Sequence, residues 1–189
     1  MNIDNEKIIR ITRRWVDAVV VNLNLCPFAG RELRKNRVRF VVTNANTEEQ
    51  LLMALEAELQ LLGSEVSIET TLLIHPQALP SFYDYNQFLN LSDGLLEQMN
   101  LIGIYQIASF HPNYRFDGTD PDATENYTNR SPYPMLHIIR EESLERAIAD
   151  YPDVGQVPAR NIVLINRLGR DRLQALLQAC FDEVDNTKH

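Results

Sequence analysis

The segment that decides the fold reads Val66-Ser67-Ile68-Glu69-Thr70-Thr71-Leu72-Leu73-Ile74-His75. Apolar and polar residues alternate in its first half, which is the period of a β-strand. Its second half holds three consecutive apolar residues, so both faces of the strand are apolar there. A strand of this kind is covered on both sides. We therefore expect a covered strand over residues 66–75.

Outward from this strand, helical and strand patterns alternate. Asp4 is placed to cap a helix over residues 5–24. Thr47 and Gln50 form a capping box before a second helix, and Gly63 is placed to end that helix in a left-handed conformation. Further strands are expected over 38–43, 102–110 and 135–140, and further helical stripes over 80–99, 143–149, 158–169 and 170–184.

This order predicts an α/β or α+β fold with a single four-stranded mixed sheet, its strands near 38–43, 66–75, 102–110 and 135–140, flanked by helices. Each connection between the first three strands contains a helix, so these strands can be parallel. An antiparallel α+β sheet is the alternative. Residues 1–189 are expected to form one domain, with 185–189 as a frayed tail.

Composition restricts the classes of function. The two cysteines, Cys26 and Cys180, show no disulfide spacing, and no apolar run is long enough for a membrane span. We therefore expect a cytoplasmic protein without a membrane partner. The net charge is −8, and the basic residues of 1–40 lack an accompanying aromatic motif, which argues against a nucleic-acid partner.

The polar segment within residues 109–141 is the main candidate for a binding site. It leaves the expected sheet at a strand end, and open α/β sheets bind ligands at the carboxyl ends of their strands. Arginine forks fit carboxylates and phosphates, so an anionic ligand is expected here. The candidate ligand-binding residues are Asn113, Tyr114, Arg115, Asn126, Arg130, His137 and Arg140. Alternatively, each arginine pairs with a nearby acid and His137 is a buried, hydrogen-bonded core residue.

His111 and Cys26 are the candidate catalytic residues. His111 follows a strand, where an imidazole can act as a general acid or base, or can hold the loop backbone. Cys26 could act as a nucleophile, but it follows a helix C-terminus, where the helix dipole disfavours a thiolate. No metal-binding pair such as Cys-x-x-Cys is present, and no motif indicates a particular cofactor, reaction or oligomeric state.

A family resemblance rests on three blocks of sequence. These are Cys26-Pro27-Phe28, Phe110-His111-Pro112 with Tyr114 and Phe116, and Ser131-Pro132-Tyr133-Pro134 followed by Leu136-His137 and Arg140-Glu141. With these blocks the chain resembles the uncharacterised bacterial domain-of-unknown-function family 1415 over most of its length. The resemblance implies a bacterial cytosolic domain and no mechanism.

Three hypotheses of function follow. The first is a small-molecule enzyme or binder for an anionic ligand, with a pocket walled by residues 109–141. The second is a non-catalytic protein-interaction module in which that segment is a packed surface loop. The third is a metal-binding protein.

Overall fold

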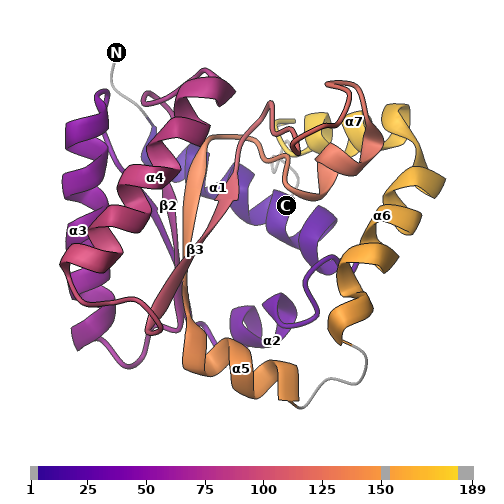
Figure 1. The fold of residues 1–189 in the computed structure, drawn as a ribbon. Helices are drawn as coiled ribbons and strands as arrows, with labels where there is room; N and C mark the ends of the chain where they lie inside the picture. The colour runs from indigo at the N-terminus through magenta and orange to yellow at the C-terminus, as the bar shows by residue number, and fades with distance from the viewer. Residues whose placement is uncertain (1–3, 150–153, 183–189) are drawn as a thin grey trace, which may run out of the picture.

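The computed structural model describes residues 4–149 and 154–182 and is built around a four-stranded sheet (Figure 1). The strands are β1 (Val38–Val42), β2 (Thr70–Ile74), β3 (Tyr105–Phe110) and β4 (Met135–Arg140). Their order across the sheet is β1-β2-β4-β3, so the last strand in the sequence lies between the second and the third.

The sheet is mixed, as the sequence predicts. β1 and β2 are parallel, and β4 is antiparallel to both of its neighbours. β3 therefore runs in the same direction as β1 and β2, although β4 separates it from them. The fold is α+β. Two strands begin later than expected, because backbone hydrogen bonds from Ile68 to Glu65 and from Ile104 to Leu101 close turns just before β2 and β3.

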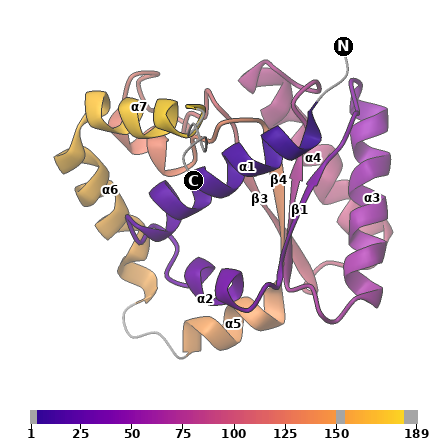
Figure 2. The same ribbon diagram turned by 180° about the vertical axis from the view of Figure 1, so that it is seen from behind.

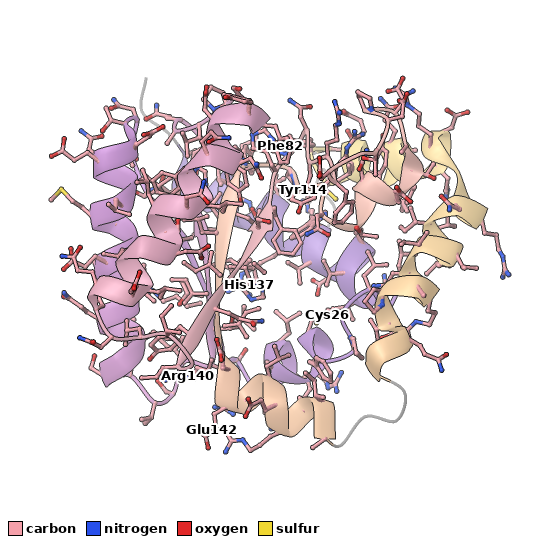
Figure 3. All side chains as sticks on the ribbon, viewed as in Figure 1. Cys26, Phe82, Tyr114, His137, Arg140 and Glu142 are labelled. Carbon is pink, nitrogen blue, oxygen red and sulfur yellow. The ribbon has the colours of Figure 1, made fainter. Side chains whose placement is uncertain are left out.

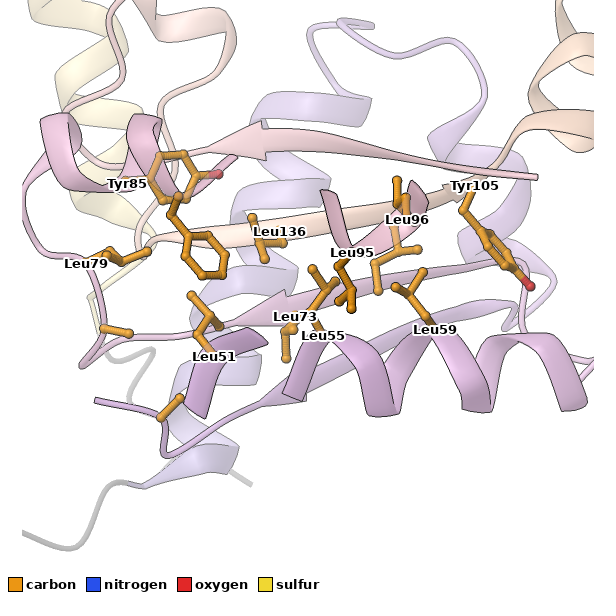
Figure 4. Close-up of a cluster of buried hydrophobic side chains, with 14 of the residues drawn as sticks. Leu51, Leu55, Leu59, Leu73, Leu79, Tyr85, Leu95, Leu96, Tyr105 and Leu136 are labelled. Carbon is orange, nitrogen blue, oxygen red and sulfur yellow. The ribbon is translucent and has the colours of Figure 1, made fainter. Parts of the chain in front are cut away.

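Two long helices cover one face of the sheet, which we call the first face. They are α3 (Glu48–Ser64) and α4 (Phe82–Gln98), both on the left of Figure 1. Figure 4 shows the buried side chains between these helices and the strands. The expected leucine stripe of α3 faces this core, where Leu51, Leu55 and Leu62 are fully buried.

Gly63 does not end α3, which corrects the sequence prediction. The helix continues through it to Ser64 and stops where Glu65 turns to an extended conformation. The guanidinium of Arg140 donates to the carbonyls of Leu62 and Glu65. An arginine from β4 thus binds helix-end carbonyls that a left-handed glycine would otherwise help to satisfy.

The N-terminal and C-terminal helices lie on the other face, the second face (Figure 2). They are α1 (Asn5–Trp15), the π-helix η1 (Val16–Val21), α6 (Val157–Leu168) and α7 (Arg170–Ala179). The helix expected over 5–24 is therefore an α-helix that becomes a π-helix. Asp4 caps α1 as predicted, because its side chain accepts a hydrogen bond from the Lys7 backbone.

Two shorter helices lie where β1 and β2 begin and β4 ends. They are α2 (Ala29–Arg34), which the sequence analysis missed, and α5 (Glu141–Ala149). Short 3₁₀ helices occur at η2 (Thr124–Thr128) and η3 (Val154–Gln156). The tail predicted over 185–189 lies outside the described residues.

Candidate functional site

A cavity of about 810 Å³ lies between the second face of the sheet and the elements η1, α2 and α5. This volume is in the range that suits a small organic ligand. Most of its wall is apolar. The sheet contributes Val38, Thr70, Leu72, Ala108, Phe110, His137 and Ile139.

Ala108 helps to explain why there is room for a cavity. Its methyl group lies beside His137 on the neighbouring strand, where a larger residue would fill the space. The helical wall opposite is irregular. η1 is a π-helix, and Asn24 just after it has a φ of 52°, which is left-handed. Such backbone irregularities often occur at functional sites.

His137 is the histidine that faces this cavity. Its Nε2 lies 2.7 Å from the hydroxyl of Thr70, and that hydroxyl lies 2.6 Å from the carbonyl oxygen of Ile138. Burial lowers the pKa of His137 to about 4, so the imidazole is neutral at pH 7. The cavity therefore contains an uncharged imidazole oriented by a hydroxyl group.

Cys26 lines the same cavity and is half-buried as a free thiol. Figure 3 shows His137 in the middle of the molecule and Cys26 nearer to α2. The adjacent Pro27 and Phe28 also line the cavity. The Cys-Pro-Phe block of the sequence is thus part of this wall.

One end of the cavity is charged. Arg37 lies between two acids: it hydrogen-bonds to Glu69, and its Nη1 is 3.5 Å from Glu32 Oε2. Arg31 and Arg146 also line the cavity, but their side chains are 54% and 66% exposed. A residue that both lines a cavity and is exposed lies at its opening, so these two arginines mark the entrance.

His111 lies away from this cavity. Its ring packs against Phe82 and Tyr85 of α4, on the side of the first face. Its Nε2 is 3.2 Å from the Leu79 carbonyl oxygen, and its Nδ1 accepts a hydrogen bond from the Asn113 backbone. Burial lowers its pKa. Both ring nitrogens are thus occupied in holding loop backbone.

Asn126 and Arg130 organise the long segment after β3. The buried Asn126 amide accepts from the Phe116 backbone at 3.0 Å and from the Thr119 hydroxyl at 2.9 Å, and it donates to the Asp120 carbonyl. Arg130 donates to the carbonyls of Tyr114 and Pro121 and lies over the Tyr127 ring. These side chains shape the loop from within.

The other predicted ligand residues also lie outside the cavity wall. Arg140 is held by carbonyls at the end of α3 and by the Tyr105 hydroxyl. Tyr114 packs against Phe82, as Figure 3 shows, while Asn113 and Arg115 are exposed. Of residues 109–141, the cavity is lined by Phe110, His137 and Ile139.

Comparison with family models identifies the chain. The family described as "Protein of unknown function (DUF1415)" matches residues 7–175, which is most of the sequence. The chain belongs to the DUF1415 family. No significant match was found among curated proteins or among solved structures. Membership of the DUF1415 family thus agrees with the resemblance seen in the sequence and assigns no activity.

Two further features of this DUF1415 chain concern a membrane span and a metal site. In the described ranges, no helix combines the length and the apolar character that a membrane crossing requires. Within the same part of the chain, no group of three or more His, Cys, Asp or Glu side chains is arranged to hold a metal ion.

Proposed function

We propose that the protein binds a small organic molecule in the cavity beside His137, with the apolar part of the ligand inside and an anionic group at the entrance. The cavity itself is the observation that carries this proposal. It has the volume of a small-molecule site, a mostly apolar wall and a few polar groups that could orient a ligand. The proposed pocket is therefore not walled by residues 109–141 alone, but by four separated parts of the chain.

The charge proposed for the ligand rests on Arg31 and Arg146. They come from α2 and α5, on different elements of the entrance. Their present partners are Glu32 at 3.1 Å and Glu142 at 3.4 Å. The Arg146–Glu142 pair is exposed on both sides, and such pairs are weak, about 0–1 kcal/mol, so a ligand carboxylate can replace Glu142 at little cost. The Arg31 side chain is 54% exposed although Glu32 is largely buried, so Arg31 can also turn to a ligand at the entrance.

Paired probes test this function. We expect 4-phenylbutyrate to raise the melting temperature of the protein more than 4-phenylbutylamine does, because the two share an apolar body and differ in charge. A ligand at about 100 times its Kd adds about 2.7 kcal/mol to stability. Ala108→Leu fills the cavity and is expected to abolish the shift. If neither probe binds the folded wild-type protein, the proposal is wrong.

Arg10→Gln is the matched control for Arg146→Gln. Both arginines form exposed i,i+4 pairs, Arg10 with Glu6 and Arg146 with Glu142. Arg10 does not line the cavity. The Arg146 variant is expected to weaken binding of 4-phenylbutyrate, and the Arg10 variant to leave it unchanged. Equal effects would show that the entrance does not select charge.

A second proposal is the non-catalytic protein-interaction module. It is favoured by the internal hydrogen bonds of Arg130 and Arg140, which engage both arginines within the fold, although with backbone carbonyls in place of the acids expected from the sequence. It predicts that neither probe raises the melting temperature.

In either case we propose a bacterial protein of the cytoplasm, as the cysteine content and the family resemblance indicate.

A further inference from the structure

We infer that Thr70 holds His137 as the tautomer with its proton on Nε2, so that the cavity presents a hydrogen-bond acceptor and selects ligands with an O–H or N–H donor. This inference rests on the proposed function and deepens it, because it names the polar group that the buried part of the ligand carries.

The first step is the position of one proton. The Thr70 hydroxyl oxygen and the Ile138 carbonyl oxygen are 2.6 Å apart, so a proton must lie between them. A carbonyl cannot donate, and a hydroxyl has a single proton, so Thr70 is the donor. Its oxygen is then the acceptor for the Nε2 of His137 at 2.7 Å. The ring proton is therefore on Nε2.

The second step is the state of the other ring nitrogen. A neutral imidazole with its proton on Nε2 has a lone pair on Nδ1. Among the described residues, no group donates a hydrogen bond to this Nδ1, and it is not one of the buried polar atoms without a partner. It is therefore open to the cavity that His137 lines.

The third step is the chemistry of the ligand. The surfaces nearest to His137 are apolar, with Ala108 and Leu72 beside it on the adjacent strands and the Phe110 ring 6.2 Å away. A donor on the ligand pairs with Nδ1, whereas a ligand oxygen without a proton would place two lone pairs together. Phenols, alcohols and amides with an N–H fit this description, because each can donate a hydrogen bond to Nδ1.

Two isosteric probes measure the selection. 4-Ethylphenol and 4-ethyltoluene differ by a hydroxyl in place of a methyl group. The wild-type protein is expected to bind the phenol about tenfold more tightly, which corresponds to one hydrogen bond made in an apolar site. Equal or tighter binding of 4-ethyltoluene overturns the inference and leaves the cavity as a binding site. If neither probe binds a protein that binds 4-phenylbutyrate, the inferred ligand class is wrong and the proposed function stands.

Variants of two neighbouring threonines provide the control. Thr70→Val removes the hydroxyl and is expected to reduce the preference for the phenol to less than about threefold, while Thr70→Ser keeps it. Thr71→Val makes the same change on the opposite face of β2, away from His137, and is expected to leave the preference intact. Loss of the preference in all three variants would show a general effect on folding and overturn the role of Thr70.

Nitrogen NMR of the free protein tests the tautomer without any ligand. The expected spectrum shows His137 protonated on Nε2 and unprotonated on Nδ1, with the assignment made by comparison with His137→Phe. In Thr70→Val this preference is expected to weaken or reverse. A wild-type His137 with its proton on Nδ1 would overturn the inference even if the cavity binds every probe.

Discussion

Polar groups in the segment after β3 already have hydrogen-bond partners within the protein, whereas the cavity beside His137 contains a polar group without one. In the segment, polar side chains such as Asn126 and Arg130 are paired with backbone groups of the same segment. In the cavity, the charged side chains gather at one end, and His137 retains an accessible ring nitrogen without a partner among the described residues. A polar-rich stretch of sequence is here the internal framework of a loop.

The two regions differ in whether their polar side chains already have hydrogen-bond partners, and the number of polar residues does not show this. A buried side chain whose hydrogen bonds are complete has no capacity left for a ligand. A polar atom without a partner is available only if it also faces open space. The comparison therefore supports a structural role for Asn126 and Arg130, and it supports the proposed ligand binding at His137. Each assignment can be tested by substitution.

The largest effect is expected for Asn126→Ala. The change leaves the Phe116 backbone N–H without its acceptor, and it removes one of the two hydrogen bonds made by the Thr119 hydroxyl and one of the two accepted by the Asp120 carbonyl. A buried group left unsatisfied costs about 1–3 kcal/mol and each further hydrogen bond lost costs about 1 kcal/mol, so a loss of about 4 kcal/mol in unfolding free energy is expected. Urea unfolding measures this loss. Asn113→Ala, at an exposed position, is the control and is expected to change the unfolding free energy by less than about 0.5 kcal/mol. Equal losses in both variants would contradict the assigned role.

A second effect is acid destabilisation through His75, a buried histidine outside the cavity. Burial lowers its pKa from 6.5 to about 4, and its Nε2 has no partner among the described residues. The unfolded chain takes up a proton below pH 6.5 while the folded protein does not until about pH 4, so stability falls across that window as the pH falls.

The magnitude of this effect is about 3 kcal/mol. We expect the stability difference between wild type and His75→Gln to narrow by up to this amount from pH 7 to pH 4, as measured by unfolding at each pH. A ligand in the cavity covers His137 but not His75, so it should leave this difference unchanged. A constant difference across the window would refute the role of His75.

Arg130→Ala is expected to have an intermediate effect. The loss of its two carbonyl hydrogen bonds and of the contact with Tyr127 is expected to cost about 2 kcal/mol, or roughly 4–8 °C in melting temperature. Binding of 4-phenylbutyrate is expected to persist. Arg115→Ala, which removes an exposed arginine of the same segment, serves as the control. If the variant kept its melting temperature but lost binding of 4-phenylbutyrate, Arg130 would be a ligand-binding residue.

The smallest effect, with the opposite sign, is expected for Thr71→Val. The Thr71 hydroxyl is fully buried and lacks a partner within the described chain, but its position on the first face separates it from the cavity. Replacing it with an isosteric methyl group is expected to raise stability by about 1 kcal/mol. A thermal melt that shows a clear loss would mean that this hydroxyl has a role that the comparison overlooks.

Much of the fold was predictable because it depends on local patterns. The two-residue and 3.6-residue periods of apolar residues identified the four strands and the stripes of the long helices. The errors lie where a distant group decides the local conformation or where a local turn shortens a strand. Gly63 is inside a helix because Arg140, far along the chain, binds the carbonyls at the end of α3. The turns before β2 and β3 shortened both strands.

The site was predictable only in part. His137 and Cys26 were candidates from their residue types and their motifs, and both line the cavity. Thr70, Ala108 and the entrance arginines Arg31 and Arg146 were missed, because neither their types nor their spacing marks them. The Cys-Pro-Phe block was the available signal, since all three of its residues line the wall.

By itself, the sequence determined most of the elements and the side of each strand that a residue faces, because both follow from short-range periodicity. The tertiary structure alone decided which polar groups are already paired. β4 enters the sheet between β2 and β3, so His137 lies beside Thr70 and Ala108, which come from distant parts of the chain. A hydrogen bond between such residues depends on strand order and register, and neither quantity is encoded in local spacing.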